Sequence, residues 1–248
     1  MVRLENCDNL DLLKQLPDNH IDLIYCDILY GTGRNFGDYQ DLKPIRSEIE
    51  NHYLPRIKEM HRILKPTGTI YLQMDYRINH WIRCILDDIF GYNNFKNEIV
   101  WYYNSAPRKN GCFGHRHDTI LRYSKTDNFK FNEIREPYSE NIGIREPKKH
   151  YYHPDGKVIG DVWQINILGQ NDKKERNGYA TQKPKTLLER IIKASSNEGD
   201  LVADFYIGSG TTGEVAIELN RSFIGCDINP RAIEIAEKRI KEAENKLF

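Results

Sequence analysis

Two residues near the N-terminus combine an acceptor carboxylate, Asp27, with a flat aromatic ring, Tyr30. They follow an apolar run, residues 21–24, of the kind that forms a buried parallel strand. Because ligands in open α/β sheets bind outside the carboxyl ends of the strands, this pair could hold a planar group that bears an amine. The alternative is a strand that ends in a solvated carboxylate and a half-buried ring, with no ligand.

A second stretch that could do chemistry lies far downstream, at residues 203–213. It runs from a predicted strand through glycines into a predicted helix, and Gly208, Gly210 and Gly213 fit the pattern G-x-G-x-x-G. An acid, Asp227, ends the next strand 19 residues after Gly208. Such glycines allow the backbone to approach a nucleoside closely, and the carboxylate can accept hydrogen bonds from ribose hydroxyls. The alternative is a tight turn that needs glycine only for its conformation.

The ligand of this glycine loop could be NAD, FAD or S-adenosylmethionine, since the glycines do not distinguish them. No lysine follows Gly213, which excludes a P-loop for nucleotide triphosphates. Two features favour S-adenosylmethionine. Only 35 residues follow Gly213, so we expect no catalytic domain after the loop, unlike in most dehydrogenases. The strand end at Asp27 and Tyr30 also offers a place for a flat amine rather than for a hydride acceptor.

Length and composition indicate one large folded domain, or one domain with an inserted lobe. The chain has 248 residues, of which 39% are hydrophobic and 29% charged, as in globular proteins. We expect no membrane span, because no run of about 18 apolar residues occurs, and no secretory signal, because the N-terminus lacks an apolar core. The five cysteines are scattered without metal-ligand spacing, which favours a reduced, cytoplasmic protein without a metal site.

The net charge of zero hides an uneven distribution. Residues 105–183 carry 15 Lys and Arg against 10 Asp and Glu, so the rest of the chain carries the opposite imbalance. A basic middle segment on an acidic frame is a candidate for binding a polyanion such as nucleic acid. A surplus of this size also occurs on ordinary solvated surfaces, so it supports a nucleic-acid partner without requiring one.

Hydrophobic periodicity predicts alternating strands and helices. The predicted strands are residues 3–7, 21–26, 69–74, 98–103, 119–124, 201–205 and 222–226. The predicted helices are residues 10–16, 53–64, 81–90, a helix opened by Pro184, 211–219 and 230–246. This alternation indicates an α/β fold with a mostly parallel sheet covered by helices on both faces. Periodicity fails from residue 126 to residue 177, where we expect an irregular lobe or insertion rather than a linker.

The whole chain resembles the amino-methylating DNA methyltransferases of restriction–modification systems, in the permuted order called the beta class. Residues 27–30, Asp-Ile-Leu-Tyr, occupy the position of the catalytic Asp-Pro-Pro-Tyr, and residues 204–212 are similar to the cofactor loop Asp-Pro-Phe-x-Gly-Ser-Gly-Thr-Thr. Residues 181–184, Thr-Gln-Lys-Pro, resemble the segment that contacts the methionine end of the cofactor, and residues 224–230 resemble the ribose-binding strand end. The order of catalytic motif, basic segment and cofactor loop is specific to this class.

The resemblance implies the Rossmann-like fold of S-adenosylmethionine-dependent methyltransferases, with a mostly parallel seven-stranded sheet and an irregular inserted target-recognition segment. The catalytic half would span residues 1–104, the basic target-recognition segment residues 105–177, and the cofactor-binding half residues 178–248. The first part of the middle segment, residues 119–124, would be a strand of the sheet. Residues 31–41 are rich in glycine and polar residues and form a candidate lid over the cofactor.

The resemblance also assigns roles to individual residues. The catalytic residues would be Asp27, Ile28 and Tyr30: Asp27 and the carbonyl of Ile28 accept hydrogen bonds from the target amine, and Tyr30 stacks on the base. The cofactor-binding residues would be Asp8 at the adenine, Asp227 at the ribose, and Thr181, Lys183, Asp204, Tyr206, Gly208, Ser209, Gly210, Thr211 and Thr212. The DNA-binding residues would be Arg108, Lys109, His115, Arg116 and His117, which cluster just after a predicted strand.

Two departures from the family pattern bear on activity. Ile28 and Leu29 replace both prolines of the catalytic tetrapeptide, and Phe205 replaces the proline of the cofactor loop. Proline fixes φ near roughly −65° and so preorganises a turn. Its loss should loosen the catalytic geometry without removing a hydrogen-bond acceptor, so a slower enzyme or an inactive DNA-binding relative is an alternative.

The implied activity is transfer of a methyl group from S-adenosylmethionine to N6 of a flipped adenine in double-stranded DNA. Adenine is preferred because the tetrapeptide begins with Asp, and N4 of cytosine is the alternative because both amines fit the same hydrogen bonds. A nicotinamide or flavin oxidoreductase on the same glycine loop, and a methyltransferase for RNA or a protein amide, are further alternatives. The implied partners are DNA, a cognate restriction endonuclease for the same site and a second copy in a homodimer, but no membrane.

Overall fold

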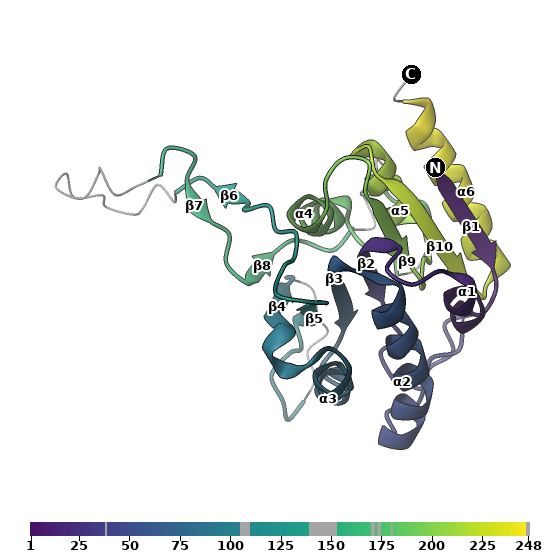
Figure 1. Ribbon diagram of the computed structural model, residues 1–248. Helices are drawn as coiled ribbons and strands as arrows, with labels where there is room; N and C mark the ends of the chain where they lie inside the picture. The colour runs from purple at the N-terminus through teal and green to yellow at the C-terminus, as the bar shows by residue number, and fades with distance from the viewer. Residues whose placement is uncertain are drawn as a thin grey trace.

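The computed structural model describes residues 1–37, 39–104, 110–138, 153–169, 172, 175–179 and 181–246. Within these residues the centre of the molecule is a sheet of eight strands (Figure 1). In spatial order they are β1 (Val2–Asn6), β10 (Ser222–Asp227), β9 (Leu201–Asp204), β2 (Ile21–Asp27), β3 (Leu64–Met74), β5 (His117–Ser124), β4 (Phe95–Tyr102) and β8 (Val162–Gln164). Strand β5 runs antiparallel to both of its neighbours, and the other neighbouring pairs are parallel. The predicted α/β fold with a mostly parallel sheet is confirmed.

Helices cover both faces of this sheet. One face packs against α1 (Asn9–Gln15), α2 (Arg46–Ile63) and α3 (Asn79–Phe90), which a short 3₁₀ helix (Tyr92–Asn94) follows. The other face packs against α4 (Lys185–Ser195), α5 (Thr211–Glu218) and α6 (Pro230–Asn245). Because the strands are parallel except β5, the carboxyl ends of β2, β9 and β10 lie at one edge, where β5 begins.

Strand β2 shows why helices are needed on both faces. Its side chains from Ile21 to Cys26 are buried, as expected for a strand inside a parallel sheet. Ile24 and Cys26 pack with the core under α1, α2 and α3, whereas Leu23 and Tyr25 pack with the core under α4, α5 and α6. Complete burial of one such aliphatic side chain contributes about 1.5–3 kcal/mol to the stability of the fold.

One charged residue of β2 is also buried. The Asp22 side chain is 2% exposed, and its carboxylate accepts hydrogen bonds from the ammonium groups of Lys65 at 2.7 Å and Lys130 at 2.9 Å. Lys130 also contacts Asp200 at 2.7 Å. Burial raises the pKa of Asp22, but the two lysines and the N–H of Leu201 together outweigh burial and bring the pKa below its ordinary value. Asp22 therefore ties the segment after β5 to the centre of the sheet.

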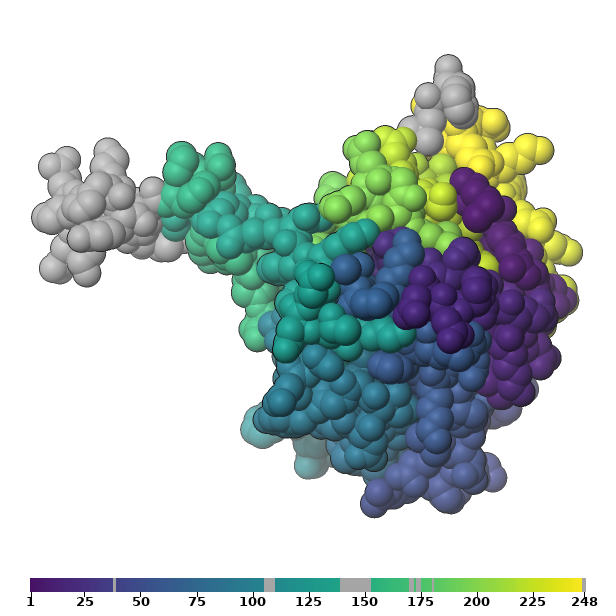
Figure 2. Space-filling view, viewed as in Figure 1, coloured from purple at the N-terminus to yellow at the C-terminus, as the bar shows by residue number. Residues whose placement is uncertain are grey.

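The predicted count of seven strands is wrong by one, because β8 adds an eighth strand beside β4. It lies in the stretch predicted to be irregular, and three residues are too few to show the alternation of a strand. Its Trp163 is buried, and the Arg190 guanidinium carbon lies 5.1 Å from the centre of the Trp163 ring. Two further short strands, β6 (Arg135–Glu136) and β7 (Lys157–Val158), form a ribbon that stands away from the body of the molecule (Figures 1 and 2).

Several elements begin earlier than predicted, and the difference is largest for α2 and β3. Helix α2 begins at Arg46 rather than at residue 53, and its first turns carry few apolar residues to reveal the helical period. Strand β3 begins at Leu64 rather than at residue 69, because a register irregularity in its pairing with β2 admits Pro66 and Gly68. In the described part of the chain, no helix combines the length and the apolar character needed to cross a membrane.

Candidate active site

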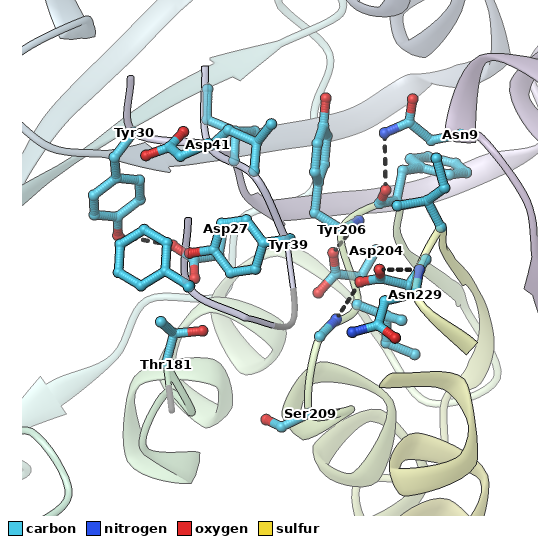
Figure 3. Close-up of a pocket in the computed structure, with 18 of the residues that line it drawn as sticks. Asn9, Asp27, Tyr30, Tyr39, Asp41, Thr181, Asp204, Tyr206, Ser209 and Asn229 are labelled. Atoms are coloured by element: carbon cyan, nitrogen blue, oxygen red, sulfur yellow. Dashed lines mark hydrogen bonds between the residues drawn. The ribbon is translucent and has the colours of Figure 1, made fainter. Parts of the chain in front are cut away.

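Loops at the carboxyl edge of the sheet enclose a cavity of about 660 Å³ (Figure 3). Asp27 reaches it from the end of β2, Asp204 from the end of β9 and Asp227 from the end of β10. Most residues predicted for catalysis and cofactor binding line it: Asp8, Asp27, Ile28, Tyr30, Thr181, Lys183, Asp204, Tyr206, Gly208, Ser209, Thr211, Thr212 and Asp227. The two sequence motifs therefore form one site.

The turn after Asp27 is held by hydrogen bonds in place of the missing prolines. The N–H of Ile28 donates to the carbonyl of Gln73 at 3.1 Å, and the Tyr53 hydroxyl donates to the carbonyl of Leu29 at 3.0 Å. A proline at position 28 has no N–H and could not make the first bond. The Ile28 side chain is 2% exposed and belongs to the hydrophobic core. The loosening expected from the loss of the prolines is therefore opposed by these contacts, and a proline at position 28 could not make the first of them.

The described residues of the segment predicted as a lid (31–41) contribute one wall of the cavity, where Tyr39 and Asp41 are visible in Figure 3. The buried carboxylate of Asp41 accepts hydrogen bonds from the N–H groups of Gly31 at 3.1 Å and Thr32 at 2.8 Å. Gly31 has a φ of +67°, and a Cβ there would lie 2.7 Å from the Ile78 side chain, so the turn requires glycine. Asp41 thus fixes the base of this segment beside the catalytic motif.

Tyr30 is fixed at its hydroxyl end. The hydroxyl oxygen lies 2.7 Å from Oδ1 of Asp27 (Figure 3) and 2.7 Å from Oδ2 of Asp118, and the Gln73 amide donates to it at 3.0 Å. Burial raises the pKa of the Tyr30 hydroxyl well above its ordinary value, so the hydroxyl stays protonated at neutral pH. The motifs did not include Asp118 or Gln73. An Asp next to a predicted strand is the signal that could have pointed to Asp118.

Lys183 contacts the same groups that the target base is predicted to contact. Its ammonium forms an ion pair with Oδ2 of Asp27 and lies 5.6 Å from the centre of the Tyr30 ring. Burial raises the pKa of the Asp27 carboxyl; Lys183 and the Tyr30 hydroxyl oppose this, and the pKa remains above its ordinary value. Lys183, which was predicted to hold the cofactor, is therefore also an ion-pair partner of the predicted catalytic carboxylate.

The glycine loop and Asp227 are directly connected. The N–H of Gly208 donates to Oδ2 of Asp227 at 3.0 Å, and the N–H of Asn229 donates to Oδ1 at 2.9 Å. Burial raises the pKa of Asp227, and these backbone donors act in the opposite direction. Gly208 has a φ of +49°, which favours glycine. The loop therefore orients the carboxylate that was predicted to bind ribose.

Asp204 and Thr212 stabilise the conformation of the glycine loop. Oδ2 of Asp204 accepts a hydrogen bond from the Thr212 hydroxyl at 2.6 Å, and Oδ1 accepts one from the N–H of Tyr206 at 3.0 Å. Asp204 is 2% exposed, and this burial raises its pKa to about 7. Both residues line the cavity, but the hydrogen bonds of their side chains stabilise the loop itself.

Gly210 does not line the cavity, although it was predicted to bind the cofactor. A Cβ at Gly210 would lie 2.7 Å from Ala236, and a Cβ at Gly213 would clash with the side chain of Ile240. Both neighbours belong to α6. These two glycines therefore allow α5 to pack closely against α6, a role that the G-x-G-x-x-G pattern also serves.

The far end of the cavity contains polar residues of α1 and α2. Asp8 caps α1 and accepts two hydrogen bonds from Arg56, at 2.9 and 2.8 Å. Arg56 also donates to Asn9 at 2.6 Å, and His52 lies 3.2 Å from the Tyr206 hydroxyl. Burial and the Arg56 charge lower the pKa of His52 to about 4, so its ring is neutral at physiological pH. Asp8 and Tyr206 were predicted from the sequence, whereas their partners Asn9, His52 and Arg56 were not.

A buried cation lies under the glycine loop. Arg239 of α6 is 8% exposed, forms an ion pair with Glu214 and donates to the Thr211 hydroxyl at 2.7 Å. Lys185 also pairs with Glu214, at 3.1 Å. These charged groups join α4, α5 and α6 beneath the loop. These charged residues could not be predicted from the sequence, because isolated charges on separate helices form no recognisable motif.

Of the residues predicted to bind DNA, Arg108 and Lys109 fall outside the described residues. The other three are exposed and do not line the cavity. His115 and Arg116 lie just before β5 and His117 is its first residue, at the same edge of the sheet as Asp27. The His115 ring stacks on the Tyr76 ring, with centroids 4.0 Å apart and planes 10° apart.

A family model for N6 and N4 DNA methylases matches residues 21–238. This chain belongs to that family. It is 38% identical over 244 residues to the type II methyltransferase M.HpaI of Haemophilus parainfluenzae, covering 96% of this chain and 74% of that protein. It is 32% identical over 249 residues to the DNA adenine methyltransferase YhdJ of Escherichia coli, covering 96% of this chain and 82% of that one.

Solved structures of other methyltransferases share the fold of this DNA methylase. The cytosine-N4-specific PvuII DNA methyltransferase superimposes with a TM-score of 0.71 at 18% identity, covering 99% of this chain and 92% of that one. The complex of M1.HpyAVI with S-adenosylmethionine has a TM-score of 0.66 at 22% identity, covering 97% and 99%. The predicted Rossmann-like methyltransferase fold is confirmed.

The family assignment confirms the predicted enzyme class and cofactor: this DNA methylase is an S-adenosylmethionine-dependent methyltransferase of the restriction–modification type, and DNA is its substrate. It excludes the oxidoreductase alternative. The division of the chain at residues 104 and 177, and the roles of individual site residues, stay predictions.

Proposed function

We propose that this methyltransferase modifies N6 of adenine in double-stranded DNA, with Asp27, Ile28 and Tyr30 as its catalytic residues. The observation that carries the proposal is that the Asp27 carboxylate and the Tyr30 ring line the same cavity as the glycine loop. The similarity to YhdJ, a DNA adenine methyltransferase, supports adenine. N4 of cytosine is the second candidate, since the family includes both kinds of enzyme and both amines can donate to a carboxylate.

The residues around the cavity fit S-adenosylmethionine, which supplies an electrophilic methyl group on sulfur when it is bound. The Asp227 carboxylate, oriented by two backbone N–H groups, suits ribose hydroxyls. The cation of Lys183 and the hydroxyl of Thr181 suit the carboxylate of the methionine end. Asp8, fixed by Arg56, lies near the remaining end of the cavity and suits the adenine.

Asp27 and Tyr30 then act on the target base. Extruding the base from the duplex costs roughly a few kcal/mol, which stacking on the Tyr30 ring partly offsets. Asp27 and the carbonyl of Ile28 accept hydrogen bonds from the exocyclic amine and direct its lone pair toward the methyl donor. Orientation of this kind supplies much of the rate of such a transfer.

Asp27 also handles the charge that develops. Nitrogen becomes positively charged as it gains the methyl group, and the carboxylate stabilises that charge. The amine then loses one proton to regenerate a neutral base. Because burial raises the pKa of Asp27, its carboxylate is better matched to accept that proton than an exposed aspartate.

We further propose that His115, Arg116 and His117 contact the DNA, together with the ribbon of β6 and β7. The three residues lie at the start of β5, at the edge where Asp27 lies. The ribbon projects from the body of the molecule (Figure 2). Most such contacts go to phosphate and sugar, so none is assigned to a base. A cognate endonuclease, a homodimer and a cytoplasmic location stay predictions, tested by neighbouring genes, by size in solution and by fractionation.

The test is the identity of the methylated nucleoside. Unmethylated bacterial DNA is incubated with the protein and S-adenosylmethionine labelled in its methyl group, digested and separated by chromatography. Label in N6-methyladenine supports the proposal. Label in N4-methylcytosine would replace adenine by cytosine and leave the catalytic residues in place. Absence of label, with cofactor binding intact, would support the catalytically impaired relative.

A further inference from the structure

Asp118 is a second carboxylate beside the proposed catalytic residues. It is the second residue of β5 and is 5% exposed, and it does not line the cavity among the described residues. Its Oδ2 atom lies 2.7 Å from the Tyr30 hydroxyl, the same distance that separates this hydroxyl from Oδ1 of Asp27. Tyr30 therefore stands between two carboxylates.

Other donors hold Asp118 in place. The Gln73 amide donates to Oδ2 at 3.0 Å and the Tyr103 hydroxyl donates to Oδ1 at 3.0 Å. The Tyr25 hydroxyl donates to the side-chain oxygen of Gln73 at 2.7 Å, which orients the Gln73 amide so that its nitrogen faces Asp118 and Tyr30. Gln73 and Tyr25 are at most 1% exposed. The acceptor opposite Asp27 is therefore built into the core of the sheet.

The Tyr30 hydroxyl has one hydrogen and two carboxylate neighbours, so it can donate to only one of them at a time. A hydrogen bond from the phenol draws electron density from the carboxylate that accepts it. When the phenol donates to Asp27, that carboxylate is a weaker acceptor for the target amine. When it donates to Asp118, Oδ1 of Asp27 is left to the amine.

We propose that Asp118 is a positioning residue for methyl transfer: it accepts the Tyr30 hydrogen bond and thereby leaves Asp27 as the acceptor for the target amine. The inference rests on the proposed roles of Asp27 and Tyr30. It gives Asp118 a function that depends on the Tyr30 hydroxyl and not on the Tyr30 ring, which stays available for stacking.

The test is a double-mutant cycle that combines Asp118→Ala with Tyr30→Phe, measured as the rate of a single methyl transfer at saturating cofactor and DNA. Asp118→Ala leaves the phenol with only Asp27 as its carboxylate acceptor, and should lower the rate by about tenfold to a hundredfold. In the Tyr30→Phe background no phenol competes, so Asp118→Ala should lower the rate by less than about threefold. Asp118→Asn keeps one acceptor oxygen and should restore most of the wild-type rate.

A matched control separates this role from loss of structure. Asp87 of α3 accepts a hydrogen bond from the Tyr123 hydroxyl at 2.6 Å in a Tyr–Asp pair away from the cavity, with a half-buried carboxylate. Asp87→Ala should lower the melting temperature and leave the transfer rate of the folded protein unchanged. Equal rate losses from Asp118→Ala with and without the Tyr30 hydroxyl would overturn the proposal. An inactive wild-type protein would instead overturn the proposed function.

A second measurement applies if Tyr30→Phe is too slow to assay. Binding is compared for two duplexes that carry adenine, or purine without the amine, at the methylated position. Wild-type protein should prefer the adenine duplex, and Asp118→Ala should lose most of that preference while its affinity for S-adenosylhomocysteine stays within about twofold. An unchanged preference in Asp118→Ala would contradict the proposal.

Discussion

Replacement of Lys183 by methionine tests the electrostatics of the catalytic carboxyl. Burial raises the pKa of Asp27, and the ion pair with Lys183 is the largest effect that opposes burial. An opposite charge in contact with a carboxyl lowers its pKa, so Lys183→Met should raise the pKa of Asp27. At a pH below both pKa values the ionised fraction of Asp27 would then be smaller in the variant, by about tenfold for each unit by which the pKa rises.

The assay is a ¹³C NMR titration of the aspartate carboxyl groups in the protein without ligands. The Asp27 signal is identified by its loss in Asp27→Asn. Lys185→Met is the matched control, because Lys185 pairs with Glu214 and Glu218 instead of Asp27. The acid limb of the transfer rate should move to higher pH in Lys183→Met, since Asp27 must be ionised to accept the amine. Coincident Asp27 titrations in wild type and Lys183→Met would refute the reasoning.

Two further predictions concern stability. Ile28→Pro removes the hydrogen bond from the N–H of Ile28 to Gln73 and should lower the free energy of unfolding by about 1–3 kcal/mol in urea titrations; a gain in stability would contradict the role given to this bond. Asp22→Asn should lower the free energy of unfolding at pH 7 by about 1–3 kcal/mol, because Lys65 and Lys130 lose a charged acceptor. The folded-state pKa of Asp22 is lowered, so its contribution is present above the ordinary value of 3.8 and disappears as the pH falls through the folded value. The difference between wild type and Asp22→Asn should therefore shrink below pH 3.8, and a constant difference down to pH 2 would count against the ion pairs.

The parts of the fold that follow a local rule could be predicted from the sequence. The apolar run before Asp27 and the glycines before α5 each mark a strand that ends at the ligand edge of a parallel sheet. A parallel sheet brings such ends together, so two distant motifs predicted one cavity. Strand β8 was missed because three residues show no period, and the start of α2 was missed because its apolar face is sparse.

The rest of the site could not be predicted because it depends on which side chains meet across elements. Arg56 reaches Asp8 from α2, and Arg239 reaches Thr211 from α6, although neither residue belongs to a motif. The stabilising contact made by Ile28 could not be predicted either, because its N–H donates to the carbonyl of Gln73 on the neighbouring strand β3. Pairing of this kind is set by register and packing rather than by local sequence.

The most direct test of the central claim is to compare Asp27→Ala with wild-type protein in two measurements. Methyl transfer to DNA is followed by nucleoside analysis, and affinity for S-adenosylhomocysteine is measured by calorimetry. Asp27→Ala should abolish the formation of N6-methyladenine and bind S-adenosylhomocysteine within a few-fold of wild type, because the residues of the glycine loop and Asp227 are untouched. Retained methyl transfer in Asp27→Ala would contradict the account.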